Sequence, residues 1–244
     1  MFRTVSSRSA AVVRRPTHTS QSLAEQVFQA VKRDIVEMRL PPDTIIGEAT
    51  LAAQHSVSRA PAKEALKRLA SIGFVRAVPR VGYIVTTISV RDFDDIFGLR
   101  LELEPMAVRL AVPRLTEASV ETLQRLNEQT TRLAELPPEH QGTALAQLNA
   151  AFHREIVRVA GNTRLERIIA SLLDELERIM HMLARSPAVE LVIDEHPQLL
   201  ETMRSGDAEA AAALMRDQLA HDYRVMRELA LESGGRTPTL GARS

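Results

Sequence analysis

The sequence predicts a mainly α protein in two parts, a small N-terminal unit of three helices and a β-hairpin followed by an all-α bundle of six to seven helices. Two observations support this fold class. Residues 20–88 combine short helical patterns with one pair of strand-like segments around a proline and a glycine. Residues 89–232 consist of long stretches with helical apolar spacing and contain no convincing strand pattern.

The segment from Glu48 to Leu69 has the pattern of two helices joined by a tight turn. Residues 51–53 belong to the first helix, and the turn after it holds one apolar residue, Val57, which can fill the space between the helices. Ser58 is expected to be the N-cap of the second helix, because its hydroxyl can accept a hydrogen bond from an early unpaired N–H. Pro61 lies in the first turn of that helix, where its missing N–H costs nothing.

The second of these helices has one apolar face and one basic face. The apolar face is expected to be formed by Ala65, Leu66 and Leu69. The basic face is expected to carry Arg59, Lys63, Lys67 and Arg68. Glu64 lies close to the capping-box position and is expected to support the start of the helix. A short helix with an apolar back and a basic front is what the major groove of DNA accepts.

The residues on either side complete a winged helix-turn-helix. The second helix is expected to end at Gly73, and residues 74–78 and 83–87 are expected to pair as a β-hairpin. The tip of this hairpin, residues 79–82, contains Arg80 and is therefore basic. Ahead of them, residues 20–38 carry one apolar helical face, formed by Leu23, Val27, Ala30, Val31 and Ile35.

Charge divides the chain at the same place as the predicted fold. Residues 1–88 hold 13 lysines and arginines against 6 acidic residues, a net charge of +7, whereas residues 89–244 hold 18 against 25, a net charge of −7. A basic part joined to an acidic part is expected when only one of them meets phosphate. We therefore expect a DNA-binding domain at 20–88 and a helical domain at 89–232.

The two ends of the chain have the composition of flexible segments. Residues 1–19 contain arginine and serine but no acidic residue, and we expect a disordered basic arm there. The same composition also fits an organellar transit peptide, which is the alternative for this segment. Residues 233–244 are expected to form a flexible tail.

Composition also excludes several classes of protein and site. The chain has no cysteine, so disulfides and thiolate metal sites are excluded. No apolar run approaches the roughly 20 residues that span a bilayer, so no membrane partner is expected. Aromatic residues make up only 3% of the chain, so aliphatic side chains must fill the core of the bundle.

Proline and glycine divide the second part into amphipathic stretches with short connections. These stretches lie at about 89–112, 116–134, 142–159, 163–185, 188–204 and 207–231. Helices with short connections pack against their neighbours in antiparallel order, so we expect a helical bundle.

Histidines are the first candidates for chemistry in this bundle. Asn149 and His153 are four residues apart and project from one helix face, His196 lies near the start of another helix, and His221 lies in the last one. By spacing alone, three histidines and an amide oxygen could converge on one divalent transition metal such as Zn, Ni or Mn. The alternative is that each is an ordinary core histidine with its hydrogen bonds satisfied.

The segment from Leu23 to Thr87 resembles the DNA-binding domain of the GntR family of bacterial repressors. The similarity rests on the run I-V-E-M-R-L-P-P-D-T-I-I-G-E-A-T-L-A-A-Q-H-S-V-S-R-A-P-A-K-E-A-L-K-R-L-A-S-I-G. It implies DNA contacts at the positions of Arg59 and Gly82, and the residues expected to join them are Ser58, Lys63, Lys67 and Arg80.

Three positions depart from the pattern of that family. Pro42 stands where glycine is usual, Ala49 where a basic residue is common, and Lys63 where the second DNA-binding helix usually has arginine. Arginine grips guanine with two parallel hydrogen bonds, whereas lysine is a point charge without a fork. The preferred operator should therefore differ from that of arginine-bearing relatives.

Residues 96–225 resemble the FCD effector domain of the FadR subfamily. The motifs that carry this resemblance are R-L-E-L-E at 100–104, N-x-x-F-H at 149–153, G-N at 161–162, E-H-P-Q-L-L at 195–200 and L-A-H at 219–221. In metal-binding members an Asp or Asn and three histidines are the ligands. The resemblance therefore implies a metal bound by Asn149, His153, His196 and His221.

The resemblance also assigns an expected role to Arg100. An arginine at this position often holds the carboxylate of the effector, using its forked guanidinium. The alternative is a surface pair with Glu104, four residues further along the helix, which would contribute only a few tenths of a kcal/mol.

These expectations together describe a cytoplasmic bacterial transcription regulator, not an enzyme. Two winged helices of a homodimer would bind a palindromic operator in double-stranded DNA, and the resemblance places dimerisation in the helical domain. A small carboxylate effector bound at the metal would shift the affinity for DNA, most simply by lifting repression.

Two other functions remain open at this stage. One is a metal-dependent hydrolase with a DNA-binding appendage, which needs an open coordination site and a placed general base. Glu195 is the nearest candidate base, but adjacent residues in a helix point about 100° apart, so it is poorly placed beside His196. The other is a DNA-binding dimer whose bundle binds nothing.

Overall fold

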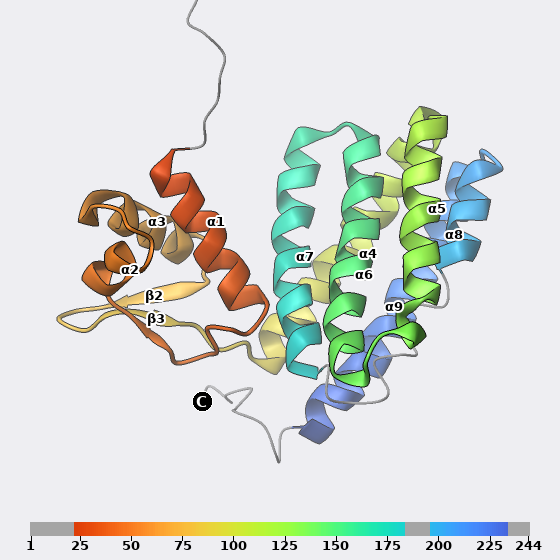
Figure 1. Ribbon diagram of the computed structural model, residues 1–244. Coiled ribbons are helices and arrows are strands. Elements are labelled where there is room, and N and C mark those ends of the chain that lie inside the picture. The colour runs from red at the N-terminus through yellow and green to blue at the C-terminus, as the bar shows by residue number, and fades with distance from the viewer. Residues whose placement is uncertain (1–21, 184–195, 234–244) are drawn as a thin grey trace, which may run out of the picture.

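The computed structural model describes residues 22–183 and 196–233. The predicted basic arm at 1–19 lies outside the described residues, as does the predicted tail except for Ser233. The N-terminal elements in chain order are α1 (Leu23–Val36), β1 (Ile45–Ile46), α2 (Glu48–Gln54), α3 (Arg59–Ser71), β2 (Val75–Val78) and β3 (Gly82–Val85). They form a compact unit on one side of the molecule (Figure 1).

The remaining helices form the bundle. They are α4 (Val90–Ala111), α5 (Glu117–Thr131), α6 (Pro138–Ala160), α7 (Thr163–Leu183), α8 (His196–Arg204) and α9 (Ala208–Ser233), with 3-10 turns at Val112–Arg114 and Leu133–Glu135. The mainly α winged helix-turn-helix plus bundle predicted from the sequence is confirmed. No helix in the described ranges has the length and apolar character needed to cross a membrane.

Helices α2 and α3 form the predicted helix-turn-helix. Leu66 and Leu69 of α3 are fully buried, and Val57 packs from the turn against the same core. Ser58 occupies the N-cap position with extended backbone, but its side chain makes no capping hydrogen bond. The third helical residue is Pro61, whose backbone has no N–H to donate, so the usual partner of the hydroxyl is missing. The predicted capping interaction of Ser58 is therefore wrong.

The sheet of the winged unit has one more strand than the sequence pattern indicated. The strand order is β1-β3-β2, with both pairs antiparallel. Ile46 of β1 lies opposite Tyr83 of β3, and Arg76 of β2 lies opposite Ile84 of β3. The hairpin strands are also shorter than predicted, since Phe74 and Thr86 lie outside them.

Helix α1 covers the back of α3. Its N-cap is Ser22, whose hydroxyl accepts a hydrogen bond of 3.1 Å from the Glu25 N–H. The buried residues of α1 are Val27, Phe28, Val31, Ile35 and Val36. Leu23, expected on the inner face, is exposed, because it stands in the first turn beyond the edge of the core.

The bundle follows the predicted helix order, with a shifted start of α6. Helix α6 starts at Pro138, one turn earlier than the apolar pattern suggested. Gly161 ends α6 with φ of 69°, a left-handed conformation that glycine adopts at little cost. The Asn162 side chain then accepts hydrogen bonds from the first turn of α7. The expected helix start at 188 lies outside the described residues.

Candidate functional site

Helix α3 presents basic side chains to solvent from the front of the winged unit. Arg59, Lys63 and Lys67 are exposed, while Ala62, Ala65, Leu66 and Leu69 are buried on its opposite side. Ser58 at the start of α3 and Arg80 at the tip of the hairpin are also exposed. The basic residues that the sequence assigns to DNA contact are thus all exposed.

Arg68 was expected on the basic face but turns towards α1. Its guanidinium bonds to the Glu25 carboxylate at 2.6 Å and lies over the Phe28 ring, 4.1 Å from the centroid. The hydrogen bond from Arg68 lowers the pKa of Glu25. Arg68 therefore fixes α3 against α1, while its side chain remains 39% exposed. The apolar spacing of Leu66 and Leu69 does not predict this contact with α1, because Arg68 lies at the border between the buried and the exposed face of α3.

Gly82 at the start of β3 has a structural reason to be glycine. Its φ is +124°, and a Cβ added to it would lie 2.8 Å from the carbonyl oxygen of Ile46. The close passage of β1 therefore excludes a side chain there. A direct DNA contact by Gly82 stays a prediction.

A buried chain of polar groups joins helices α4, α6 and α8. Arg100 and Glu104 of α4 are each only 1% exposed, and the Arg100 Nε donates to Glu104 Oε1 at 2.5 Å. The other carboxylate oxygen of Glu104 accepts from Nδ1 of His153 on α6. The predicted alternative of a surface pair between Arg100 and Glu104 is wrong, because both side chains lie inside the bundle.

The chain of polar groups ends in two imidazoles that face each other. Nε2 of His153 lies 3.3 Å from Nε2 of His196, the first residue of α8. The Phe152 ring stacks on the His196 ring, with centroids 4.1 Å apart. In the tautomer that donates from Nδ1 to Glu104, a neutral His153 ring has its lone pair on Nε2, which faces His196.

Burial and charge set the protonation of this cluster. Burial alone would raise the pKa of Glu104, but the Arg100 guanidinium and His153 outweigh it and lower that pKa to about 2. Burial, reinforced by His153, lowers the pKa of His196 well below its usual value. At neutral pH the cluster therefore contains a carboxylate, a guanidinium and a neutral His196 ring, which is the form of histidine that binds metals.

Three buried polar atoms beside this chain have no hydrogen-bond partner in the described part of the molecule. They are Nη1 and Nη2 of Arg100 and Oδ1 of Asn149. The Asn149 amide nitrogen makes only a weak contact of 3.7 Å with the Met180 sulfur on α7. Unpaired polar atoms in a protein interior are costly, so these three atoms are candidates to bind a ligand.

The four predicted metal ligands are only partly assembled. His153 and His196 face each other, and Asn149, one turn before His153, has its oxygen unpaired. His221 is half-buried on α9, and no interaction joins it to the other three within the described ranges. Among those ranges no group of three or more His, Cys, Asp or Glu side chains is arranged to hold a metal ion.

The separation of the two imidazole nitrogens nevertheless fits a shared ion. Two nitrogens bound to one tetrahedral ion at about 2.0–2.1 Å lie about 3.3 Å from each other. The carboxylate of Glu104 behind His153 is the partner that metal-ligating histidines usually have on their second nitrogen. Glu104 was noted in the sequence only as a partner of Arg100, and its contact with His153 depends on the packing of α4 against α6.

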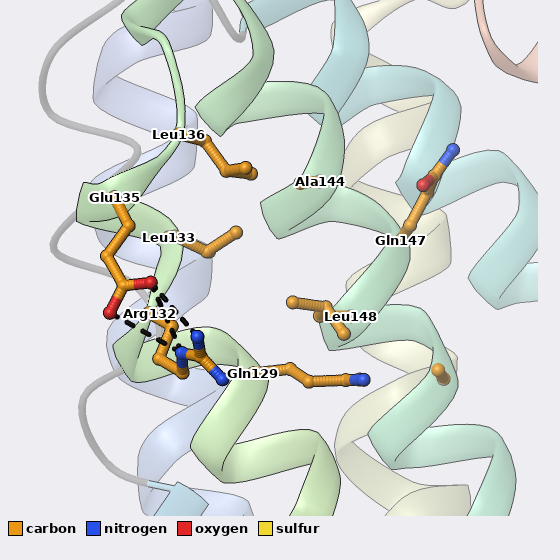
Figure 2. A pocket seen from close by; sticks show the side chains of 9 residues that line it. Gln129, Arg132, Leu133, Glu135, Leu136, Ala144, Gln147 and Leu148 are labelled. Atoms are coloured by element: carbon orange, nitrogen blue, oxygen red, sulfur yellow. Dashed lines mark hydrogen bonds and ion pairs between the residues drawn. The ribbon is translucent and has the colours of Figure 1, made fainter.

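A separate surface recess of about 500 Å³ lies between α5 and α6 (Figure 2). Arg132 and Glu135 pair at one side of it, and Leu133, Leu136 and Leu148 supply apolar lining. None of the site residues predicted from the sequence lines this recess. It is distinct from the buried cluster.

Comparison with known protein families identifies both parts of the chain. Residues 23–85 match the family described as "Bacterial regulatory proteins, gntR family", and residues 95–221 match the "FCD domain". The chain is similar to the HTH-type transcriptional regulator YdhC of Bacillus subtilis, with 28% identity over 86% of this chain and 92% of that protein. It is also similar to the HTH-type transcriptional repressor RspR of Escherichia coli, with 23% identity over 88% of this chain and 93% of that protein.

Solved structures show the same fold. The structure of McbR/YncC from Escherichia coli superposes with a TM-score of 0.74 and 24% identity, covering 85% of this chain and 98% of that chain. A transcriptional regulator of the GntR type from Rhodococcus gives a TM-score of 0.68 at 17% identity, covering 83% and 96%.

Proposed function

Because the chain belongs to the GntR family of bacterial transcriptional regulators that carry an FCD domain, we propose that it is a homodimeric regulator whose operator affinity is set by a carboxylate effector in the bundle. The family and its named relatives are regulators and not enzymes, which agrees with the prediction from the sequence. The observation that carries the proposal is the pairing of an exposed basic helix with a buried, partly unpaired polar cluster.

The proposed DNA contact rests on the exposed side of α3. Arg59 at its start, Lys63 one turn later and Lys67 form a single cationic row, and Arg80 on the wing adds charge at the flank. Side chains near the start of such a helix reach base edges in the major groove, and the wing meets phosphate or minor groove.

The test is a titration of DNA selected from a random pool by the intact protein. Arg59→Ala should weaken binding to the selected site strongly, because an arginine–base contact contributes about 1–3 kcal/mol. Arg125→Ala, at an exposed site on α5, is the control and should leave affinity unchanged. Equal affinity of Arg59→Ala and parent protein at fixed salt would refute the proposed contact. Lys63→Arg should change the selected sequence more than the affinity for random DNA.

The proposed dimer is supported by an apolar stripe on the outer side of α4. Leu99 and Met106 are 50% and 43% exposed, and the partly buried Leu103 and Leu110 continue the same face at helical spacing. Asp95 precedes this stripe, and Arg109 lies near its C-terminal end. A second copy of α4 lying antiparallel on the stripe would place unlike charges opposite each other, as a two-fold interface requires.

The proposed metal would be held by His153 and His196, with Asn149 and His221 completing its ligands. The support is the 3.3 Å separation of the two Nε2 atoms, the carboxylate behind His153 and the unpaired Asn149 oxygen. When bound, a divalent ion would supply an open position for an anionic oxygen of the effector. His153 is oriented for this by Glu104 without any contribution from the ion.

The proposed effector is a small carboxylate bound between this cluster and Arg100. The Nη1 and Nη2 atoms of Arg100 form the end of the guanidinium that pairs with carboxylates through two parallel bonds, and both atoms lack partners. Glu104 holds the Nε side of the same guanidinium, so the fork is already oriented. Such a regulator would act in the bacterial cytoplasm, where its DNA lies.

A further inference from the structure

The bundle touches the winged unit chiefly through one helix, α7. This helix runs beside the winged unit in Figure 1, and α1 packs against it. Asp174 and Arg178 lie four residues apart on α7, and therefore on one face of it. Both residues bind groups of the winged unit, whereas Met180 of α7 contacts Asn149 of the buried cluster.

Arg178 binds the segment that joins the two parts of the chain. Its Nη2 donates to the carbonyl oxygen of Thr86, and its Nη1 lies 3.5 Å from the Thr86 hydroxyl. Thr86 is in turn tied to the end of α3, because its hydroxyl donates to the Gly73 carbonyl at 2.7 Å and its N–H donates to the Phe74 carbonyl at 3.1 Å. Arg178 therefore connects α7 to the residues that follow the recognition helix α3.

Arg178 is an unusual residue to find at such a joint. It is only 3% exposed, and its Nε has no partner among the described residues. Burial lowers its pKa to about 10, so the guanidinium is still charged at neutral pH. A buried charge with few partners is tolerated only in one well-fitted arrangement, and a small shift of its surroundings changes its energy strongly.

Asp174 makes the second connection. Its carboxylate binds Lys32 of α1 and also accepts from Arg154 of α6 at 2.9 Å. Arg154 directly follows His153, and it also bonds to Glu177 of α7 at 3.1 Å. A displacement of α6 at His153 therefore changes the position of Arg154, and Asp174 joins Arg154 to Lys32 of α1.

We propose that Asp174 and Arg178 are positioning residues that form an interdomain latch, through which the state of the buried cluster sets the orientation of α3. This inference rests on the proposed function, because it supplies the route between the effector site and DNA. The latch consists of the contacts Arg178–Thr86 and Lys32–Asp174–Arg154. It predicts that the winged unit is held in one orientation while both contacts are intact and is released when either is broken.

The first measurement tests the latch without DNA, metal or effector. The chain has no cysteine, so Ala53→Cys on α2 and Glu121→Cys on α5 give two exposed sites for spin labels. The labelled chain is diluted with excess unlabelled chain so that only distances within one chain are observed. The parent protein should give a narrow distance distribution, whereas Asp174→Asn and Arg178→Gln should broaden or shift it.

Matched controls separate the latch from a general loss of charge. Glu155→Gln removes a carboxylate that pairs within α6, and Arg167→Gln removes an exposed guanidinium from α7 itself. Both controls should keep the parent distribution. If Arg178→Gln fails to fold by circular dichroism, Arg178→Lys keeps the charge but loses the two-point grip on Thr86, and it should broaden the distribution in the same way. Distributions equal to the parent's for Asp174→Asn and for whichever Arg178 variant folds would overturn the latch.

The second measurement tests the coupling, with zinc chloride and a chelator as probes. In the parent, adding or removing zinc should change affinity for the selected DNA by about 5–150-fold. In Asp174→Asn the change should fall to none, while zinc content remains that of the parent. If zinc does not change the DNA affinity of the parent, the proposed metal response is refuted. The positioning role of the latch still stands in that case if both latch variants broaden the distance distribution. A full zinc response in both latch variants would overturn the coupling.

Discussion

His153 and His196 approach each other through their Nε2 atoms at 3.3 Å, although they belong to helices 43 residues apart in sequence. One imidazole is fixed by Glu104 behind it, and the other is fixed by the Phe152 ring stacked on it. Neither ring can turn away without losing its support. The two nitrogens are thus held ready for a common partner, which reduces the conformational entropy lost when that partner binds.

Removing one of these imidazoles should remove the metal. His196→Ala should lower the content of divalent transition metal per chain and the thermal midpoint, because an ion that binds only the folded state stabilises it. His140→Ala is the control, since His140 is exposed near the start of α6. Elemental analysis of both variants after growth with added zinc, nickel or manganese decides the matter. Parent protein with no bound metal after such growth would contradict the proposed ligands.

Arg100→Lys should abolish binding of the carboxylate effector while the protein stays folded. Lysine keeps a positive charge beside Glu104 but cannot offer the two parallel N–H groups of Nη1 and Nη2. A thermal-shift screen of small organic acids on parent protein identifies a ligand, and the screen is then repeated with the variant. Arg109→Lys, whose side chain pairs with Glu209 on the surface, should keep the shift. An acid that stabilises Arg100→Lys as much as the parent would show that the effector binds elsewhere.

Met106→Glu should dissociate the proposed dimer. It places a charge in the middle of the apolar stripe on α4, and two such charges would meet near the two-fold axis. Leu136→Glu is the matched control, because Leu136 is similarly exposed but lies beside the surface recess between α5 and α6. Sedimentation of the three proteins gives the masses. A dimeric Met106→Glu protein with parent affinity would place the interface on another face.

Gly82→Ala should destabilise the winged unit by about 1–3 kcal/mol or more, because alanine is strained at φ of +124° and its Cβ would meet the Ile46 carbonyl oxygen. Gly98→Ala on α4 is the control. Its new Cβ would meet nothing within 4 Å, and alanine should stabilise the helix by about 0.5–1 kcal/mol. Urea unfolding followed by circular dichroism measures both changes. A neutral Gly82→Ala would mean that β1 can move away from β3 at little cost.

Glu175→Gln should raise the stability of the protein at neutral pH. Burial, with Asp92 adding to it, raises the pKa of Glu175 above its usual value, so the native state holds its proton more tightly than the unfolded chain. The parent therefore loses stability as pH rises through the native pKa of this group, and it regains that stability at lower pH. The advantage of the variant should shrink when urea unfolding is repeated below the ordinary pKa of a carboxyl group. An advantage independent of pH would contradict this cause.

The sequence predicted best what depends on local spacing. The inward face of α3 and the order of the bundle helices follow from apolar periodicity, and Leu66 and Leu69 are buried as expected. Strand β1 was missed because two residues, Ile45 and Ile46, carry no recognisable alternation. The contact of Arg68 with α1 was missed because a residue at the border of two helix faces takes its partners from the tertiary packing, here Glu25 and Phe28.

The sequence named His153 and His196 as candidates, but it did not predict how they are arranged. The four-residue spacing of Arg100 and Glu104 indicated that they touch, yet only the packing of α4 against α6 and α9 determines that the pair is buried. The contact of Glu104 with His153 joins residues 49 positions apart and leaves no local pattern. The contact of Arg178 with Thr86 also leaves no local pattern, because in the sequence Arg178 is only one of several charged residues on an amphipathic helix.

The two connections of α7 to the winged unit differ in what they demand of it. Arg178 binds a backbone carbonyl, which every amino acid at position 86 would provide, whereas Asp174 binds the side chain of Lys32. A different DNA-binding unit joined to this bundle would therefore keep the first connection automatically. It would keep the second only if a cationic side chain stood at the matching turn of its first helix. Exchange of DNA-binding units between regulators of this kind would then preserve the fold. The response to the effector would depend on one side chain of the incoming unit, the one at the position of Lys32.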